Sequence, residues 1–473
     1  MDSTGRDLGA ASRGGALLGA GAALMVASGA WLAAADRPDG LLIAGVGLHL
    51  VLGLALLVPC AVWWWRRRGR PLVRLGGALL LASGAAGCLL LALGNRDALR
   101  PLLWTHAVLA LAGLASLLAA VAPARRGPLW WAAAGGLLLA VLAPGMALAW
   151  RSWNPPGALA AANPAPSRDA AGAAMGGAAG PFYPTRASTR DGNPAAARLF
   201  LAAQSCGRSG CHADLTRQWD GSAHRFSGLD NPWYRATFAQ MRQARGVTAS
   251  RWCAGCHAPA TLLSGAADGA PDGLAATPLG RAGVSCTVCH AISRVKGTTG
   301  QAAYELDTPA LYRLALSDSA LARDLYEVLL RIDPALHRRS FSRPFTASAE
   351  LCSTCHSVRM DKAANGYHWF RVADDYRDWQ VSSVSGQGYL LVTAFPPPRS
   401  CTDCHMPEVR SADAGGRQGR IHSHRFASAN TAVPAWRGDA EQQAAVTSSL
   451  RSGAVTVDIF SMLEPPAAGA AGG

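Results

Sequence analysis

Five long apolar stretches fill the first 150 residues of the chain, at about residues 15–35, 41–65, 72–94, 102–122 and 129–150. Each reaches the roughly 20 residues that a helix needs to cross the hydrocarbon core of a bilayer. Trp residues stand at several of their ends, as is typical of a membrane interface. Buried helices of a large soluble protein would not be five in a row with almost no charge. The pattern predicts a transmembrane bundle of about five helices over residues 1–153.

The Arg residues that flank these stretches are distributed unequally between the two sides of the predicted membrane. Nine lie before the first stretch, between the second and third, and between the fourth and fifth, whereas three lie in the alternate loops. By the positive-inside rule, the N-terminus is cytoplasmic and the chain after Trp150 lies outside. The first stretch ends in three Ala residues after a basic start and could be a cleaved signal peptide, which leaves four helices and the same outer location. We expect a multi-pass protein of the bacterial cytoplasmic (inner) membrane with its C-terminal part on the periplasmic side.

Two ionisable side chains fall inside the apolar stretches, His49 in the second and His106 in the fourth. Both are expected in the outer half of the bilayer, at nearly the same depth. Ionisable side chains within a membrane are functional candidates by default. The pair could hold one non-covalent haem b, could line a quinol pocket, or could simply bond nearby carbonyls or water.

The hydrophobic pattern changes after residue 153. Residues 154–198 are rich in Pro, Ala and Gly and predict a linker. Residues 199–440 predict a compact domain with little regular structure, followed by a tail over 441–473. The clearest helix in this part covers residues 317–332, with Ser317 or Asp318 as its cap. The stretch 454–460 alternates as a strand does and could pair or remain unfolded.

Ten of the twelve cysteines fall into five pairs, and every pair is followed at once by His. In Cys-x-x-Cys-His, two thiols can form thioethers with the vinyl groups of one haem while the His ligates iron, so the motif indicates c-type haem attachment. Zinc or disulfides would leave the His unexplained, and a thioredoxin-like motif would occur once. The predicted attachment residues are Cys206, Cys211 and His212; Cys253, Cys256 and His257; Cys286, Cys289 and His290; Cys352, Cys355 and His356; and Cys401, Cys404 and His405.

The first of these motifs, CGRSGCH, has two more residues between its cysteines than the other four. The extra residues can bulge outward, and Gly207 and Gly210 ease that bend. We interpret the motif as an intact site with a looped-out linker. The alternative is a disulfide and four haems.

Five further His residues match five irons in number and predict bis-His ligation throughout: His224, His337, His368, His422 and His424. Such haems are suited to electron transfer. The residues of the pair His422 and His424 would point to opposite sides of an extended segment and serve different haems. If one spare His is not a ligand, one haem is open, and Lys296, Lys362, Met360 or Met406 are alternative ligands.

The formal net charge of +14 comes almost entirely from Arg. Haem propionates would offset much of it, so the charge does not indicate nucleic acid, and no nucleic-acid fold signature is present.

The C-terminal half resembles the multihaem cytochromes related to tetrahaem cytochrome c-554 and octahaem hydroxylamine oxidoreductase. The resemblance covers about residues 200–430 and is carried by CHADLTRQWDGSAH, GVSCTVCH, LCSTCHSV, CTDCHMP and HSHRFASAN. It implies a mainly α, loop-rich domain packed around haem, with His224 in Trp-x-x-Ser-x-His and His424, with His422, as distal ligands. This chain departs from the group in having five motifs, no Tyr-linked catalytic haem signature, no lysine-based attachment and an N-terminal helical half. The enzymatic activities of the group are therefore not carried over, and no catalytic residue is assigned.

Three functions fit these features. The favoured one is a membrane-anchored pentahaem cytochrome that carries electrons between the quinone pool and periplasmic or outer-membrane redox proteins, in either direction. The second is a membrane-tethered oxidoreductase acting on a small nitrogen or sulfur compound at a five-coordinate haem; the number of distal ligands discriminates the two. The third is a redox or gas sensor, which the sequence disfavours because it shows no cytoplasmic output domain.

Overall fold

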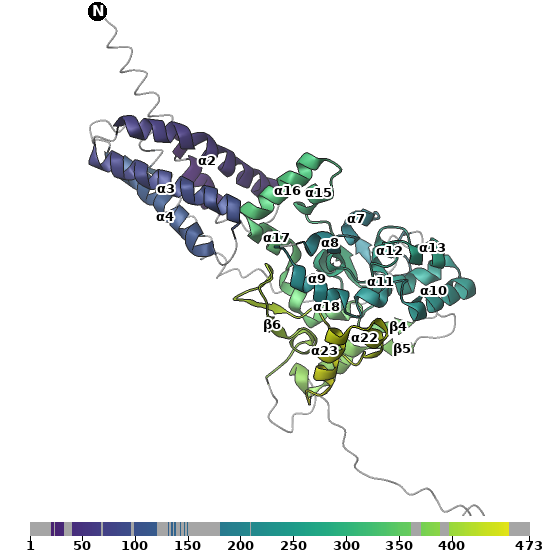
Figure 1. Cartoon of the computed structure of the whole chain (residues 1–473). Helices are drawn as coiled ribbons and strands as arrows, with labels where there is room; N and C mark the ends of the chain where they lie inside the picture. Colours follow the sequence, from purple (N-terminus) through teal and green to yellow (C-terminus); the bar gives the residue numbers. More distant parts are fainter. Residues whose placement is uncertain are drawn as a thin grey trace, which may run out of the picture.

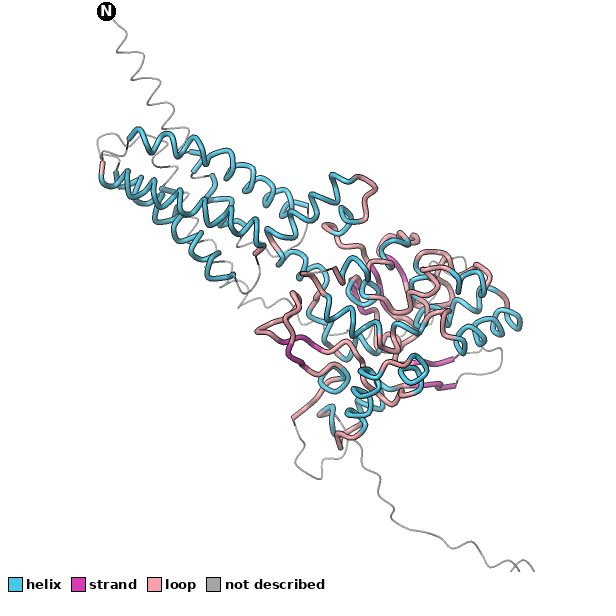
Figure 2. The backbone as a smooth tube through the Cα atoms, viewed as in Figure 1, coloured by secondary structure: helices cyan, strands magenta, loops and turns pink. Residues whose placement is uncertain are grey.

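The computed structural model describes residues 20–32 (except 23), 40–67, 70–95, 99–120, scattered positions between 131 and 149, 180–360 (except 209), 370–387 and 397–453. Its described part is mostly helical, as expected. Long helices make up the N-terminal bundle, whereas short helices alternate with loops in the remainder (Figure 2). The two parts therefore differ in architecture as they differ in hydrophobic pattern.

Three helices of the N-terminal bundle are long and apolar enough to cross a membrane: α2 (Gly40–Arg67), α3 (Pro71–Leu93) and α4 (Arg100–Ala120). A shorter apolar helix covers Ala20–Leu32. The fifth predicted stretch, 129–150, lies mostly outside the described residues. Helices α3 and α4 approach closely where a Cβ added to Gly76 would lie 2.8 Å from the carbonyl oxygen of Gly113. Such contacts through small residues are typical of helices packed in a bilayer.

The C-terminal part consists of short helices and three small sheets (Figure 1). The α-helices up to α15 are α7 (Ala197–Phe200), α8 (Ala203–Cys206), α9 (Ala213–Asp220), α10 (Pro232–Arg245), α11 (Val247–His257), α12 (Pro259–Leu263), α13 (Pro271–Ala276), α14 (Cys286–His290) and α15 (Tyr312–Ala315). They are followed by α16 (Ala320–Ile332), α17 (Pro334–Phe341), α18 (Ala349–Ser353), α20 (Asp375–Val381), α21 (Cys401–His405), α22 (Ala432–Arg437) and α23 (Ala440–Leu450). The 3-10 helices are η4 (Arg225–Ser227), η5 (Pro344–Ala347) and η6 (Ser383–Ser385).

The strands are two to four residues long and serve mainly to fix loops. The first sheet has the order β1-β3-β2, in which β1 (Ser188–Thr189) runs parallel to β3 (Tyr304–Leu306) and β2 (Ile292–Val295) runs antiparallel to it. The other two sheets are antiparallel pairs: β4 (Val358–Met360) with β5 (Phe370–Ala373), and β6 (Glu408–Arg410) with β7 (Arg420–His422). In the last pair, His422 lies opposite Glu408.

The packed part of the chain extends beyond both ends of the predicted domain. Phe182 and Ala187 are buried in the core, and β1 is part of a sheet, although both precede Leu199. At the other end, α23 continues past residue 440 and buries Val446. Residues 180–198 look like a linker in composition because their Ala, Gly and Pro carry little hydrophobic signal, yet small side chains pack well against a core.

Helix α16 matches the helix predicted over residues 317–332, but its predicted cap was wrong. The Oγ of Ser319, not Ser317 or Asp318, accepts a hydrogen bond from the Ala322 amide at 3.4 Å. Ser317 instead accepts a hydrogen bond from the Ser319 amide. The stretch 454–460, predicted to alternate as a strand, lies outside the described residues.

Helix α16 joins the two parts of the molecule. It lies against α2 and α3 at the end of the bundle that contains Gly40 and Leu93 (Figure 1). The Asn95 amide donates to the carbonyl oxygen of Arg331 at 2.8 Å, and Val46 of α2 is buried in the same apolar cluster as Leu329 of α16. The core of the C-terminal part therefore continues into the bundle at this end.

Candidate functional site

Four of the Cys/His motifs lie on short helices. CAGCH ends α11, CTVCH forms α14, CTDCH forms α21, and CSTCH begins in α18. On a helix, residues i, i+3 and i+4 share one face. Each motif therefore directs two thiols and one imidazole to the same side, which fits the two vinyl groups and the iron of a single haem.

The longer first motif reaches the same arrangement by a different path. In CSTCH, the His356 amide donates to the carbonyl oxygen of Cys352 at 2.9 Å. In CGRSGCH, the His212 amide donates to the carbonyl oxygen of Cys206, also at 2.9 Å. The same two positions are joined despite the two extra residues, and Gly210 takes the bend with a φ of 80°. All twelve cysteines lie among the described residues, and none of them is in a disulfide.

Cysteines of different motifs contact one another. Cys206 and Cys286 lie close enough to act on each other's ionisation: Cys286 lowers the pKa of the Cys206 thiol to about 7, and Cys206 raises the pKa of the Cys286 thiol. Equivalent contacts join Cys256 to Cys355 and Cys352 to Cys401. Burial, and then the neighbouring Cys355, raise the pKa of Cys289 in the third motif, so these two thiols also lie close together. The five motifs therefore form one connected cluster in which CSTCH neighbours the second, third and fifth.

In four of the five motifs, the His imidazole is oriented by a hydrogen bond at Nδ1. The acceptors are the carboxylates of Asp413 for His212 (2.9 Å) and Asp375 for His356 (3.0 Å), and the carbonyl oxygens of Phe341 for His290 (2.7 Å) and Ala427 for His405 (2.9 Å). Because these oxygens can only accept, the proton stays on Nδ1 and the Nε2 lone pair is free for a metal. Such partners are the usual outer shell of a metal-bound His, so the donor set fits haem c.

Three of the predicted distal His residues lie close to the His residue of a Cys/His motif. The ring centroids lie 6.0 Å apart for His212 and His337, 6.2 Å for His290 and His424, and 6.2 Å for His224 and His356. A metal–imidazole bond is about 2 Å, so two imidazoles on opposite sides of one metal have centroids about 6 Å apart. The interplanar angles are 16°, 15° and 87° in the same order. The three pairs therefore have the spacing of axial ligands to one iron.

Burial keeps the three distal imidazoles neutral. It lowers the pKa of His224, His337 and His424 to about 4, so each ring is in the form that ligates a metal at neutral pH. His424 donates from Nδ1 to the carbonyl oxygen of His422 at 2.9 Å. Within the described part of the chain, the buried Nδ1 of His224 has no hydrogen-bond partner.

The Trp-x-x-Ser-x-His segment positions His224 beside the third motif. The Trp219 indole donates to the carbonyl oxygen of Val284 at 2.8 Å, and Ser222 Oγ donates to that of Trp219. The Val284 amide donates in turn to the carbonyl oxygen of His224 at 2.9 Å. This close approach requires Gly283, because a Cβ there would lie 2.6 Å from the His224 oxygen and its φ is 56°. The segment after the first motif thus places the His224 ring beside His356 of the fourth motif.

The second and fifth motifs differ from the other three, because neither His257 nor His405 lies opposite another His ring among the described residues. No His of the described residues is paired with His257; the Tyr234 ring packs on it at a centroid distance of 4.8 Å. That distance is too short for an iron between the two rings, which needs about 6 Å. The Tyr234 hydroxyl is buried with no hydrogen-bond partner among the described residues, and burial raises its pKa well above the usual value.

For two of the predicted distal His residues, the structure describes no neighbouring His of a Cys/His motif. His368 lies outside the described residues. His422 is exposed on β7, and its Nδ1 donates to the carbonyl oxygen of Met406, next to His405, at 2.9 Å.

In the bundle, the ring centroids of His49 and His106 lie 6.4 Å apart.

Asp413 is a site residue that the sequence did not reveal. Its carboxylate is fully buried, holds Nδ1 of His212, and also accepts hydrogen bonds from the Asp214 and Leu215 amides at the start of α9. Burial alone would raise the pKa of Asp413, but hydrogen bonds from His212, Gly415 and Leu215 lower it below the usual range. Asp413 is about two hundred residues from its partners, and nothing local in SADAGG marks it.

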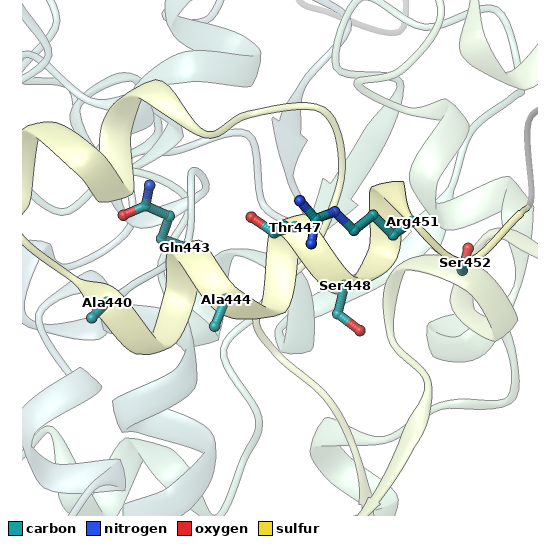
Figure 3. A pocket seen from close by; sticks show the side chains of 7 residues that line it. All are labelled: Ala440, Gln443, Ala444, Thr447, Ser448, Arg451 and Ser452. Atoms are coloured by element: carbon teal, nitrogen blue, oxygen red, sulfur yellow. The ribbon is translucent and has the colours of Figure 1, made fainter.

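One surface hollow is separate from these residues. It has a volume of about 770 Å³ and lies along α23, where Gln443, Thr447 and Arg451 point into it with small side chains (Figure 3). It contains no Cys or His. The described residues also hold no cluster of three or more His, Cys, Asp or Glu arranged for a bare metal ion.

Residues 205–291 match the family model described as cytochrome c554 and c-prime. This match supports a c-type cytochrome family. The matched segment includes the first three motifs and the Trp-x-x-Ser-x-His segment. No curated protein and no solved structure matches the chain significantly. The cytochrome match implies covalently bound haem c and a haem c electron-transfer or redox function, and the three long apolar helices fit a membrane protein.

Replacing Asp413 by Asn is expected to raise the reduction potential of the haem at the first motif. The change removes a buried negative charge from Nδ1 of His212, which destabilises the ferric state relative to the ferrous state. The expected rise is about 60 mV, or about 1.4 kcal/mol for one electron. A spectroelectrochemical titration of the full-length protein measures it.

Asp375→Asn is the matched control, because it makes the same change at His356 with a carboxylate that is 69% exposed rather than buried. Solvent screening should leave a much smaller shift there. An equal shift in both variants, or none in Asp413→Asn, would contradict this account of the buried carboxylate.

Proposed function

We propose that the protein is a membrane-anchored pentahaem c-type cytochrome that transfers electrons between the membrane quinone pool and periplasmic or extracellular redox partners. Haem c, when bound, supplies one-electron Fe(III)/Fe(II) chemistry. The observation that carries the proposal is the connected cluster of attachment cysteines. An enzyme needs one reactive centre, whereas five adjacent attachment sites suit a continuous electron path.

The ligand positions support the same function. Three imidazole pairs have the spacing of two axial ligands, and a haem closed on both faces is suited to electron transfer rather than to substrate binding. The docking of α16 against α2 and α3 supports a link to the membrane, because it places the core of the cytochrome part at one end of the bundle. That end is the outer one under the positive-inside rule.

The quinone link can be tested with full-length protein in detergent or liposomes. Oxidation of one quinol yields a quinone, two protons and two electrons, and each ferric haem accepts one electron. A short-chain quinol should reduce the ferric protein, or the matching quinone should oxidise the ferrous protein, as followed by the haem c absorption bands. Absence of both reactions in protein that dithionite fully reduces would exclude the quinone pool as partner.

A second function is supported by one observation, the packing of the Tyr234 ring on His257 at a centroid distance of 4.8 Å. A five-coordinate haem there would let the protein act as a membrane-tethered oxidoreductase on a small nitrogen or sulfur compound. Cyanide should then bind the ferric protein, and carbon monoxide the ferrous protein, at one haem per chain. Spectra unchanged by both ligands would exclude this function.

A further inference from the structure

We propose that the N-terminal bundle binds one non-covalent haem b between His49 of α2 and His106 of α4. The site would extend the electron path of the proposed function into the membrane, and its role rests on that function. Binding itself is a separate property of the bundle and can be measured without any electron-transfer assay.

The two imidazoles already have the spacing of axial ligands. Their ring centroids lie 6.4 Å apart with an interplanar angle of 81°. This separation is close to the 6.0–6.2 Å of the three pairs in the cytochrome part and to the roughly 6 Å expected across one metal. The residues come from different helices, so the pair depends on the packing of the bundle and not on local sequence.

A serine of a neighbouring helix fixes each imidazole. His49 Nδ1 lies 2.8 Å from Ser28 Oγ, which itself donates to the carbonyl oxygen of Met25 at 2.9 Å and so accepts from the ring. His106 Nδ1 donates to the carbonyl oxygen of Ser83 at 2.8 Å. Both rings therefore carry the proton on Nδ1. Among the described residues, neither Nε2 has a hydrogen-bond partner, which leaves both lone pairs for a metal.

A glycine also lies beside each imidazole. A Cβ added to Gly29 would be 3.2 Å from Cε1 of His49, and one added to Gly87 would be 3.1 Å from Cε1 of His106. The same set of one His, one Ser and one Gly thus occurs twice, once on each side of the pair. A His whose only role is a hydrogen bond to a carbonyl oxygen would not require a glycine beside its ring. A haem bound between the two imidazoles does require small neighbouring residues, because its macrocycle is flat and wide.

The site would lie near the junction with the cytochrome part. Val46 is one turn before His49 on α2 and is buried in the cluster that includes Leu329 of α16. His337, the distal partner of His212, follows on α17 immediately after α16. The pair His49 and His106 is therefore at the end of the bundle that meets the first attachment site.

Full-length protein purified from membranes in detergent tests the proposal. Acid–acetone extraction separates non-covalent haem from covalent haem c, and the pyridine haemochrome spectrum identifies each. We expect one extractable haem b per chain. His49→Ala and His106→Ala should each lose it, with unchanged covalent haem on a haem-stained gel. The perpendicular rings should also give a highly anisotropic low-spin ferric signal that disappears with the extractable haem.

A matched pair of glycine variants separates the site from general damage to the bundle. Gly87→Val should abolish extractable haem, whereas Gly47→Val should retain it, because no atom lies within 4 Å of a Cβ at Gly47. Wild-type protein with full covalent haem but no extractable haem would overturn the proposal, as would retention of haem b in both His variants. A quinol pocket would give that first result while leaving quinol reduction of the haem c bands intact, so failure of this site and failure of the proposed function are distinguishable.

Discussion

Replacing His224 by Ala is expected to convert one haem from the low-spin to the high-spin ferric form. The ring of His224 faces that of His356 at 6.2 Å, so the variant should lose the sixth ligand at the CSTCH motif. Because these rings are perpendicular, at 87°, the wild-type haem should give a highly anisotropic low-spin signal. Electron paramagnetic resonance of the full-length ferric protein should show one such signal replaced by one high-spin equivalent.

Phe426→Leu is the matched control for this variant. Phe426 packs edge-on against the His224 ring at a centroid distance of 4.2 Å but has no ligating atom. Its replacement should disturb the packing and leave the spin state low. Gly283→Ala should have an intermediate effect, because the new Cβ would meet the carbonyl oxygen of His224 and displace the ligand. An unchanged spectrum in His224→Ala would contradict the assignment of His224 to this motif.

Features set by local spacing could be predicted from the sequence. The five Cys/His motifs follow from residue type and order alone, and the apolar stretches that became α2, α3 and α4 follow from length and hydropathy. The helix at 317–332 was also recognised from its periodicity, although its cap was not. Ser317, Asp318 and Ser319 are all good caps, so the choice depends on where the preceding loop packs.

Features set by the tertiary fold could not be predicted in this way. The sequence supplied five spare His residues, but which one faces which motif depends on contacts between distant segments such as His290 with His424. The contact between Tyr234 and His257 could not be predicted from the sequence, because a tyrosine near the start of a helix is more often a core residue. Asp413 likewise becomes recognisable only when the loop after β6 reaches His212.

The clustered cysteines explain why so small a domain can hold these sites. Where Cys206 lies near Cys286, and Cys352 near Cys401, two motifs share one piece of core. Short helices suffice because each needs only one turn to orient two thiols and an imidazole. The loops between them then have to supply the distal ligands, which is why His224, His337 and His424 all lie outside the motifs.

Replacing both Cys206 and Cys211 by Ala is expected to reduce covalent haem from five to four per chain, since five motifs are present. Cys206 is the last residue of α8, and the His212 amide donates to its carbonyl oxygen, so the loop between the two cysteines is closed. Intact mass measurement and a haem-stained gel of the full-length protein give the count. A wild-type count of four, unchanged in the double variant, would mean that CGRSGCH does not carry haem.

A variant in the loop is the sharper test, because it keeps both thiols and changes only where they lie. Gly210→Val keeps both cysteines but puts a β-branched residue at a φ of 80°, which such residues strongly avoid. We expect partial loss of the first haem, between the wild type and the double Ala variant. Gly192→Val is a matched control, with a φ of 76° in a turn remote from the motifs. If only Gly210→Val loses haem, attachment depends on the closed loop that joins His212 to Cys206; equal counts in both variants would show that the two thiols suffice without it.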